Sequence, residues 1–351
     1  MPRTLVKRAL RYSLIVVGVG VMAWTLHSLG PRQVLDIALQ ADPFWLLLSG
    51  VAVFGRFLIW GIKWSLMLRR KEPVPYSLSL RILAAGSFVN LTTPTAKLAG
   101  GVLRAALLRR RRKWGWASAY GWALADQVTN VLGNTLFAAV LVIALAPSLP
   151  TGGVLLATIG VAAIGLLIFI GWARGWVWER IGRPAIHDRL VAWIPARLRS
   201  KDSDRHTDGL IRELFRPLLF EGGPWRSYVI DLLWAAAAFT SLCLANALVF
   251  RALGIEAPLL ALAAAVCLGY VVGVVIGVWG GIGVTEAALT AFYVQIGVDE
   301  GAAAAAALLH RALFYTVVCG WGGYSLLREG RPSVVEELAD EKGSNDPSHP
   351  G

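Results

Sequence analysis

Charged residues are scarce in this chain. Asp, Glu, Lys and Arg make up 16% of its 351 residues, whereas a soluble globular domain carries about 25%. Hydrophobic residues account for 56%, and several apolar runs approach the roughly 20 residues that a helix needs to cross a bilayer. The composition excludes a soluble globular protein and predicts an all-α polytopic membrane protein.

Cysteine is also rare. Cys243, Cys267 and Cys319 all lie within apolar segments and match no metal-ligand spacing, so we interpret them as small buried hydrophobic residues. The five histidines form no HExxH or other paired-ligand pattern. The sequence therefore predicts no catalytic residue, no metal and no cofactor, and we expect that the chain is not an enzyme.

Basic residues outnumber acidic ones, which gives a formal net charge of +12. In a membrane protein this excess collects in cytoplasmic loops, where it contacts anionic lipids of the inner leaflet. Nucleic acid is not expected as a partner, because no soluble domain remains to bind it. The positions of the basic residues predict a cytoplasmic (inner) membrane protein with both termini in the cytoplasm. Homo-oligomerisation is left open.

The apolar runs predict about six transmembrane helices and two re-entrant hairpins. The runs are 12–29, 44–68, 116–146, 152–173, 226–250 and 302–327. The first half consists of two spans, a hairpin that enters from the cytoplasmic side and a third span. The second half consists of two spans, a hairpin that enters from the outer side and the sixth span. This order is an inverted repeat, a common plan of transporters, with halves of about 12–146 and 152–327.

We expect 1–331 to form a single integral membrane domain. The basic segment 174–225 is predicted to be a cytoplasmic amphipathic linker. The acidic tail 332–351 is expected to be a disordered cytoplasmic segment.

The first hairpin is predicted around residues 86–101, where both flanks are basic and the ends must therefore lie on the same side of the membrane. Pro94 breaks any helix here, and Asn90 is among the side chains that can satisfy the backbone groups this frees. A polar cytoplasmic loop is the alternative interpretation.

Two short motifs in the chain have similar sequences. Gly101 and Gly283 each begin Gly-Val-x-x-Ala-Ala-Leu, and Arg104 takes the place in the first motif that Glu286 takes in the second. We interpret the motifs as the tips of the two hairpins and expect Arg104 to lie close to Glu286.

Further charges fall inside apolar runs, where each costs about 3 kcal/mol if it faces lipid. Most must therefore face the interior or, as Lys63 could, extend to the head groups. Asp126 is either a functional carboxylate or a structural partner of Arg56 or Lys63. The candidate substrate-binding residues are Arg56, Lys63, Asn90, Pro94, Lys97, Gly100, Gly101, Arg104, Asp126, Gly281, Gly283, Glu286 and Arg311.

These residues carry a family resemblance. The chain resembles the transmembrane, flippase-like part of the lysylphosphatidylglycerol synthases over about 40–327. The motifs that carry this resemblance are Lys63-Trp64, Phe88-Val89-Asn90 with Pro94, Gly280 to Val284 with Glu286, and His310-Arg311. The resemblance implies lipid translocation. Val278 and Trp279 stand where the family usually has a proline, and no soluble aminoacyltransferase domain follows residue 331, so we expect no lysyl-lipid synthesis.

Three functions remain open at this point. The chain could translocate a phospholipid or a lipid-linked head group through a polar cavity between the hairpins, with Arg56, Lys97 or Arg104 holding phosphate. Glu286 and Asp126 could then balance the charge or contact a cationic head group. It could be an intramembrane transferase with Glu286, Asp126 or His310 as the base. It could also be a non-transporting scaffold in which Arg104 and Glu286 form a structural ion pair.

Overall fold

A computed structural model describes residues 31–93, 98–145, 213–217, 225–276 and 283–329. The predicted runs 12–29 and 152–173, most of the linker and the C-terminal tail lie outside these residues. The outer limits of the two halves therefore stay predictions.

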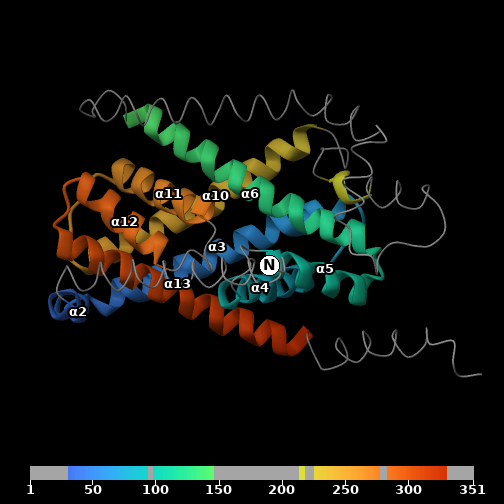
Figure 1. Cartoon of the computed structure of the whole chain (residues 1–351), viewed down its shortest axis with the longest axis horizontal. Helices are drawn as coiled ribbons and strands as arrows, with labels where there is room; N and C mark the ends of the chain where they lie inside the picture. Colours follow the sequence, from blue (N-terminus) through green and yellow to red (C-terminus); the bar gives the residue numbers. More distant parts are fainter. Residues whose placement is uncertain (1–30, 94–97, 146–212, 218–224, 277–282, 330–351) are drawn as a thin grey trace, which may run out of the picture.

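The described part of the chain is helical (Figure 1). A short helix α2 (Pro31–Leu39) precedes two series of four helices. The first series is α3 (Pro43–Arg69), α4 (Tyr76–Thr92), α5 (Leu98–Arg112) and α6 (Trp116–Leu145). The second series is α10 (Trp225–Ala252), α11 (Leu259–Ile276), α12 (Val284–Gln295) and α13 (Glu300–Glu329).

Helices α3, α6, α10 and α13 are long and apolar enough to cross a membrane. The shorter helices α4 and α5 pack on each other, as do α11 and α12, so each series contains one hairpin between two long helices. These findings confirm the all-α polytopic membrane class. They also match four of the six predicted spans closely.

Local chemistry sets the limits of these helices. Asp42 caps α3 by accepting a hydrogen bond from the backbone of Phe44 (2.8 Å), and Pro43 occupies the first turn. Helix α4 stops at Thr93, whose backbone is extended, as the following Pro94 requires. The Thr93 hydroxyl donates to the carbonyl oxygen of Val89 (2.6 Å), which satisfies an acceptor near the helix end.

The two series are inverted relative to each other. The equivalent helices α3 and α10 pack side by side and run antiparallel. The Ser49 hydroxyl near the start of α3 donates to Ala245 near the end of α10 (2.8 Å), while Arg70 at the end of α3 pairs with Asp231 near the start of α10 (2.7 Å). The hairpins that follow α3 and α10 therefore enter from opposite ends of the molecule. Figure 1 shows them on opposite sides of its centre.

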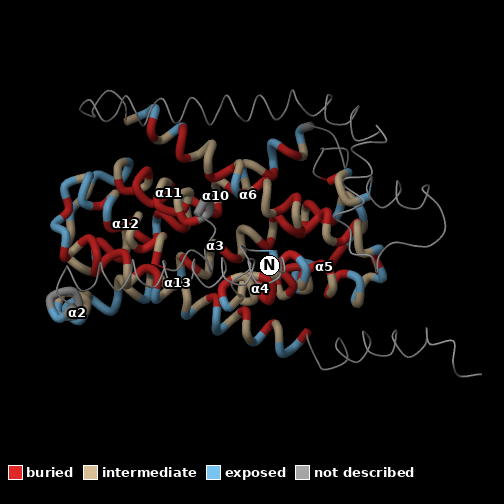
Figure 2. Tube along the Cα trace, in the orientation of Figure 1, coloured by how far each residue is buried: buried red, intermediate tan, exposed pale blue. Residues whose placement is uncertain are grey.

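Packing between the series follows the same two-fold plan. Helix α13 packs along α4, and its counterpart α6 packs along α11, so the last helix of each series covers the hairpin of the other. Figure 2 shows buried residues on both hairpins as well as on the long helices. The two largest apolar cores contain Trp64 and Leu107 of the first series and Leu242 and Tyr293 of the second.

Glycines bring the hairpin helices close together. A Cβ on Gly100 would overlap the carbonyl oxygen of Gly86 on α4, and one on Gly273 would overlap the Thr285 side chain on α12. Gly100 and Gly101 lie inside the first turn of α5, directly after residues 94–97, which lie outside the described residues, so their predicted place at the hairpin tip stays a prediction. Their place is set by helix contact, which a sequence motif of small residues does not distinguish from a turn. Gly283 immediately precedes α12 with a φ of 81°.

Candidate functional site

The first series holds a buried cluster around Asp126 on α6. Lys63 on α3 lies 3.0 Å from one carboxylate oxygen, and Arg104 on α5 lies 2.6 Å from the other. The Trp60 indole N–H is 3.1 Å from both oxygens. Lys63 also donates to Asn130 (2.8 Å), so its ammonium points into the protein and not to the head groups. The alternative that Asp126 pairs with Lys63 is therefore confirmed.

The second series holds a buried pair between Glu286 on α12 and Arg311 on α13. Arg311 Nε donates to Glu286 Oε1 (2.9 Å), and the Tyr315 hydroxyl donates to the same oxygen (2.6 Å). The guanidinium of Arg311 also lies 4.6 Å from the centre of the Tyr315 ring. The other oxygen of Glu286, Oε2, is buried without a hydrogen-bond partner among the described residues.

The expected pairing of Arg104 with Glu286 is wrong. Arg104 pairs with Asp126 and Glu286 pairs with Arg311, so each of these two residues of the repeated motif has its partner on the long helix that follows its hairpin. The equivalence of the two positions holds, with the charges exchanged between the halves. Because the hairpins enter from opposite ends, helices α5 and α12 share no substantial contact.

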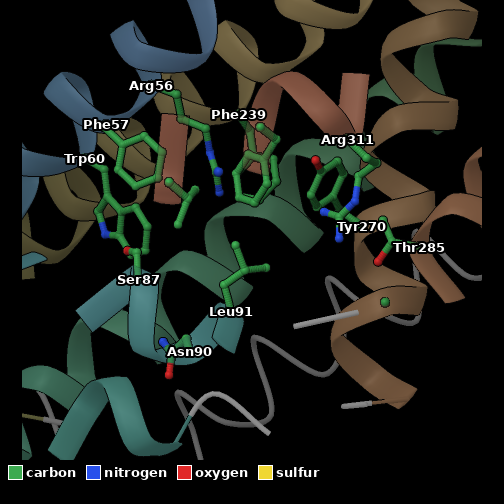
Figure 3. A pocket seen from close by; sticks show the side chains of 13 residues that line it. Arg56, Phe57, Trp60, Ser87, Asn90, Leu91, Phe239, Tyr270, Thr285 and Arg311 are labelled. Atoms are coloured by element: carbon green, nitrogen blue, oxygen red, sulfur yellow. The ribbon is translucent and has the colours of Figure 1, made fainter. Parts of the chain in front are cut away.

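A cavity of about 130 Å³ lies where the two hairpins approach each other. Its wall comes from α3, α4 and α10 to α13, and Figure 3 shows the side chains converging on it. The lining residues are Arg56, Phe57, Trp60, Ser87, Asn90, Leu91, Phe239, Tyr270, Gly273, Thr285, Arg311, Phe314 and Val318.

Arg56 extends from α3 into this ring of side chains (Figure 3). Its guanidinium lies 5.4 Å from the ring centre of Phe239, 5.5 Å from that of Phe314 and 5.7 Å from that of Trp60. Its Nε and Nη1 are buried and have no hydrogen-bond partner in the described part of the chain. Aromatic faces stabilise a cation but do not replace the hydrogen bonds that its N–H groups lose on leaving water.

The predicted site residues divide into three groups. Arg56, Asn90 and Arg311 line the cavity. A second group stands behind its wall or packs the helices: Lys63, Gly100, Gly101, Arg104, Asp126, Gly283 and Glu286. Trp60 joins the two groups, because it lines the cavity and donates to Asp126. Pro94, Lys97 and Gly281 lie outside the described residues.

Sequence reasoning missed the aromatic and hydroxyl part of the wall. Trp60 follows Arg56 by four positions and shares its helix face, so this neighbour could have been found from spacing alone. Phe239, Tyr270 and Thr285 come from other helices, and only the three-dimensional packing brings them to Arg56. No signal in the local sequence marks them.

A further buried polar network surrounds His310 on α13. Within the described ranges, no group of three His, Cys, Asp or Glu residues could hold a metal. His310 Nε2 lies 3.2 Å from the Asn246 amide nitrogen and 3.1 Å from the Tyr270 hydroxyl. Since the Asn246 carbonyl oxygen already accepts from Tyr293, its amide group donates and His310 Nε2 accepts.

The whole chain is similar to two membrane proteins of nearly the same extent. It is 24% identical to a UPF0104 membrane protein of Methanothermobacter thermautotrophicus, over 93% of this chain and 98% of that protein. It is 22% identical to a UPF0104 membrane protein of Pyrococcus horikoshii, over 91% of this chain and 97% of the relative. The family model for the lysylphosphatidylglycerol synthase TM region matches residues 12–322. The chain is thus a multi-pass membrane protein that belongs to the lysylphosphatidylglycerol synthase TM region family.

Proposed function

We propose that this protein translocates the polar head group of a phospholipid or lipid-linked molecule across the cytoplasmic membrane. The observation that carries the proposal is the cavity between the two inverted halves, which is lined by both hairpins and holds Arg56, whose Nε and Nη1 have no hydrogen-bond partner among the described residues. Inverted-repeat transporters place their substrate sites at this kind of interface. Membership of a lipid-related family supports a lipid as the transported molecule.

The size of the cavity suggests how such a protein would work. A volume of about 130 Å³ fits a group of phosphate size and excludes a whole lipid. The head group would therefore cross between the halves while the acyl chains remain in the bilayer. The halves must also move apart on one side to admit it, because ion pairs and apolar contacts close the present arrangement. We place both termini in the cytoplasm on the basis of the basic loops.

The alternative functions draw less support from the geometry. Asp126 already accepts from Lys63, Arg104 and Trp60, so both of its oxygens are engaged. Of the candidate bases for a transferase, Glu286 keeps one oxygen without a hydrogen-bond partner among the described residues. A scaffold would explain the ion pairs within each half. It would not explain a cavity whose wall includes a cation without a carboxylate partner in the described ranges.

The test is head-group translocation in liposomes that contain only this protein. A lipid with a fluorescent label on an acyl chain reports transfer between leaflets without enlarging the head group, and Ser87→Trp fills the cavity from α4. We expect Ser87→Trp to abolish transfer and Val140→Trp to leave it intact, because Val140 is 54% exposed on the outer surface of α6. Equal transfer by both variants, or no transfer by the unaltered protein, contradicts the proposal. A modified lipid that appears only with an added donor supports a transferase.

A further inference from the structure

We infer that the cavity is selective for an anionic head group carrying a phosphodiester, with Arg56 as its anchor, and that it disfavours a cationic head group. This inference rests on the proposed function and adds the substrate class to it. It depends on the charge balance around the cavity and on which cations already have partners.

Arg56 differs from the other interior cations in having no carboxylate partner in the described part of the chain. Lys63 and Arg104 share Asp126, and Arg311 pairs with Glu286. Arg56 is surrounded by rings, and two of its three nitrogen atoms are buried without an acceptor among the residues that the structure describes. A bound anion would supply those missing acceptors.

The wall of the cavity suits a phosphate oxygen. A guanidinium presents its N–H groups in a planar fork that matches two oxygens of one phosphate. Aromatic faces above this plane leave its N–H edge free to point at a ligand. Asn90 and Thr285 line the same cavity from opposite hairpins and add an amide and a hydroxyl group as further donors. Phosphate bound here would therefore contact both halves of the repeat.

Charge balance argues against a cationic head group. Four described cations, Arg56, Lys63, Arg104 and Arg311, stand in or directly behind the wall, against two carboxylates, Asp126 and Glu286. An anionic phosphodiester lowers this positive excess, whereas an aminoacylated phosphodiester brings ammonium groups into it. At low dielectric such like-charge contacts are costly.

Equilibrium binding to the purified full-length protein tests the inference. The probes are dioctanoyl phosphatidylglycerol, its lysyl ester, dioctanoylglycerol and inorganic phosphate. We expect phosphatidylglycerol to bind about tenfold or more tightly than its lysyl ester, and dioctanoylglycerol not to bind. Arg56→Gln should weaken phosphatidylglycerol binding by about tenfold or more, since it removes charge-assisted hydrogen bonds. Arg69→Gln is the matched control, because Arg69 is on the same helix and exposed.

Several outcomes would overturn the inference. These are equal binding of the lysyl ester, unchanged binding in Arg56→Gln, and binding of inorganic phosphate alone, which would indicate a soluble anion. If Arg56→Gln does not fold, two other measurements test the inference. These are the preference of the unaltered protein for phosphatidylglycerol over its lysyl ester, and partial binding of phosphatidylglycerol by Arg56→Lys. Translocation without a preference for anionic lipids would contradict only this inference. Selective binding of phosphatidylglycerol without translocation would contradict only the proposed function.

Discussion

At the scale of single residues, the interior is organised by two ion pairs with exchanged charges. Removing charges from water costs several kcal/mol per ion, and the cost is offset only where geometry is good and further hydrogen bonds are made. Asp126 meets that condition through Lys63, Arg104 and Trp60, and Glu286 meets it in part through Arg311 and Tyr315. These pairs hold each hairpin to the long helix that follows it.

The first prediction concerns the carboxylate shared by two cations. Asp126→Asn leaves Lys63 and Arg104 buried without a counter-charge, and we expect it to destabilise the protein by about 3–5 kcal/mol. Unfolding of the detergent-solubilised protein would measure the loss. Glu256→Gln, at an exposed position, should change stability little. Similar stability of the two variants would show that the cluster is not a structural unit.

The second prediction tests which charges are coupled. A double-mutant cycle on Glu286→Gln and Arg311→Met should give a coupling energy above about 1 kcal/mol, because the two side chains are in direct contact. A cycle on Glu286→Gln and Arg104→Met should give a value near zero, since Arg104 is paired elsewhere. A larger coupling energy for Glu286 with Arg104 than with Arg311 would contradict the observed pairing and favour the Arg104–Glu286 contact that the sequence motifs suggest.

At the scale of helices, the first hairpin depends on a glycine contact. Gly100→Ala would place a Cβ against the carbonyl oxygen of Gly86 and against Asn90, so α4 and α5 must separate. We expect a loss of about 1–3 kcal/mol, the usual cost of overpacking. Gly50→Ala is the control, because no atom lies within 4 Å of its added Cβ. The stability of the two variants would be compared by measuring the fraction of each protein that stays monodisperse after heating. Equal survival would contradict the close contact.

The sequence predicts these helices better than it predicts their contacts. Hydropathy places the spans within a few residues, as for 44–68 against Pro43–Arg69, because burial in lipid demands an uninterrupted apolar run. Pro94 correctly marks the end of α4, because proline acts on the residue before it. The partner of Arg104 was not predictable, because equivalent positions in a repeat say nothing about contact. The part of the aromatic wall formed by Phe239, Tyr270 and Phe314 was not predictable, because these side chains come from helices far from Arg56 in sequence.

At the scale of the whole molecule, the inverted repeat predicts opposite accessibility for the two hairpins. Pro73 and Glu256 lie just before the first helix of each hairpin. Cysteines placed at these positions, with Cys319 replaced by Ala, should react with an impermeant maleimide from opposite sides of oriented vesicles. The buried Cys243 and Cys267 should not react. Labelling of both introduced cysteines from one side would contradict the inverted arrangement.

The ion pairs between the halves are not spread evenly over the molecule. At the end where α3 finishes, Arg70 pairs with Asp231, and Glu329 at the end of α13 pairs with Arg81 (2.6 Å) and Arg111 (2.8 Å). At the other end, the described residues join α3 to α10 by a backbone hydrogen bond from Asp42 to Ala252 (2.8 Å). Among the described residues, ion pairs between the halves therefore lie at one end, while the other end has the contact of Arg251 with the Trp45 ring (5.5 Å), and opening the first end must break these pairs.

This asymmetry yields the last prediction. Glu329→Gln removes the carboxylate charge that Arg81 and Arg111 share, so the end of α13 should separate more often from α4 and α5. A cysteine at Ser87 in the cavity, again without Cys319, should then react severalfold faster with a hydrophilic thiosulfonate added at that end. Glu300→Gln, at the exposed opposite end of α13, should leave the rate unchanged. Loosening one end of two rigid halves opens the cavity at that end and not at the other. Faster labelling from the opposite side would therefore contradict the prediction and would mean that Glu329 stabilises the arrangement that is open at its own end.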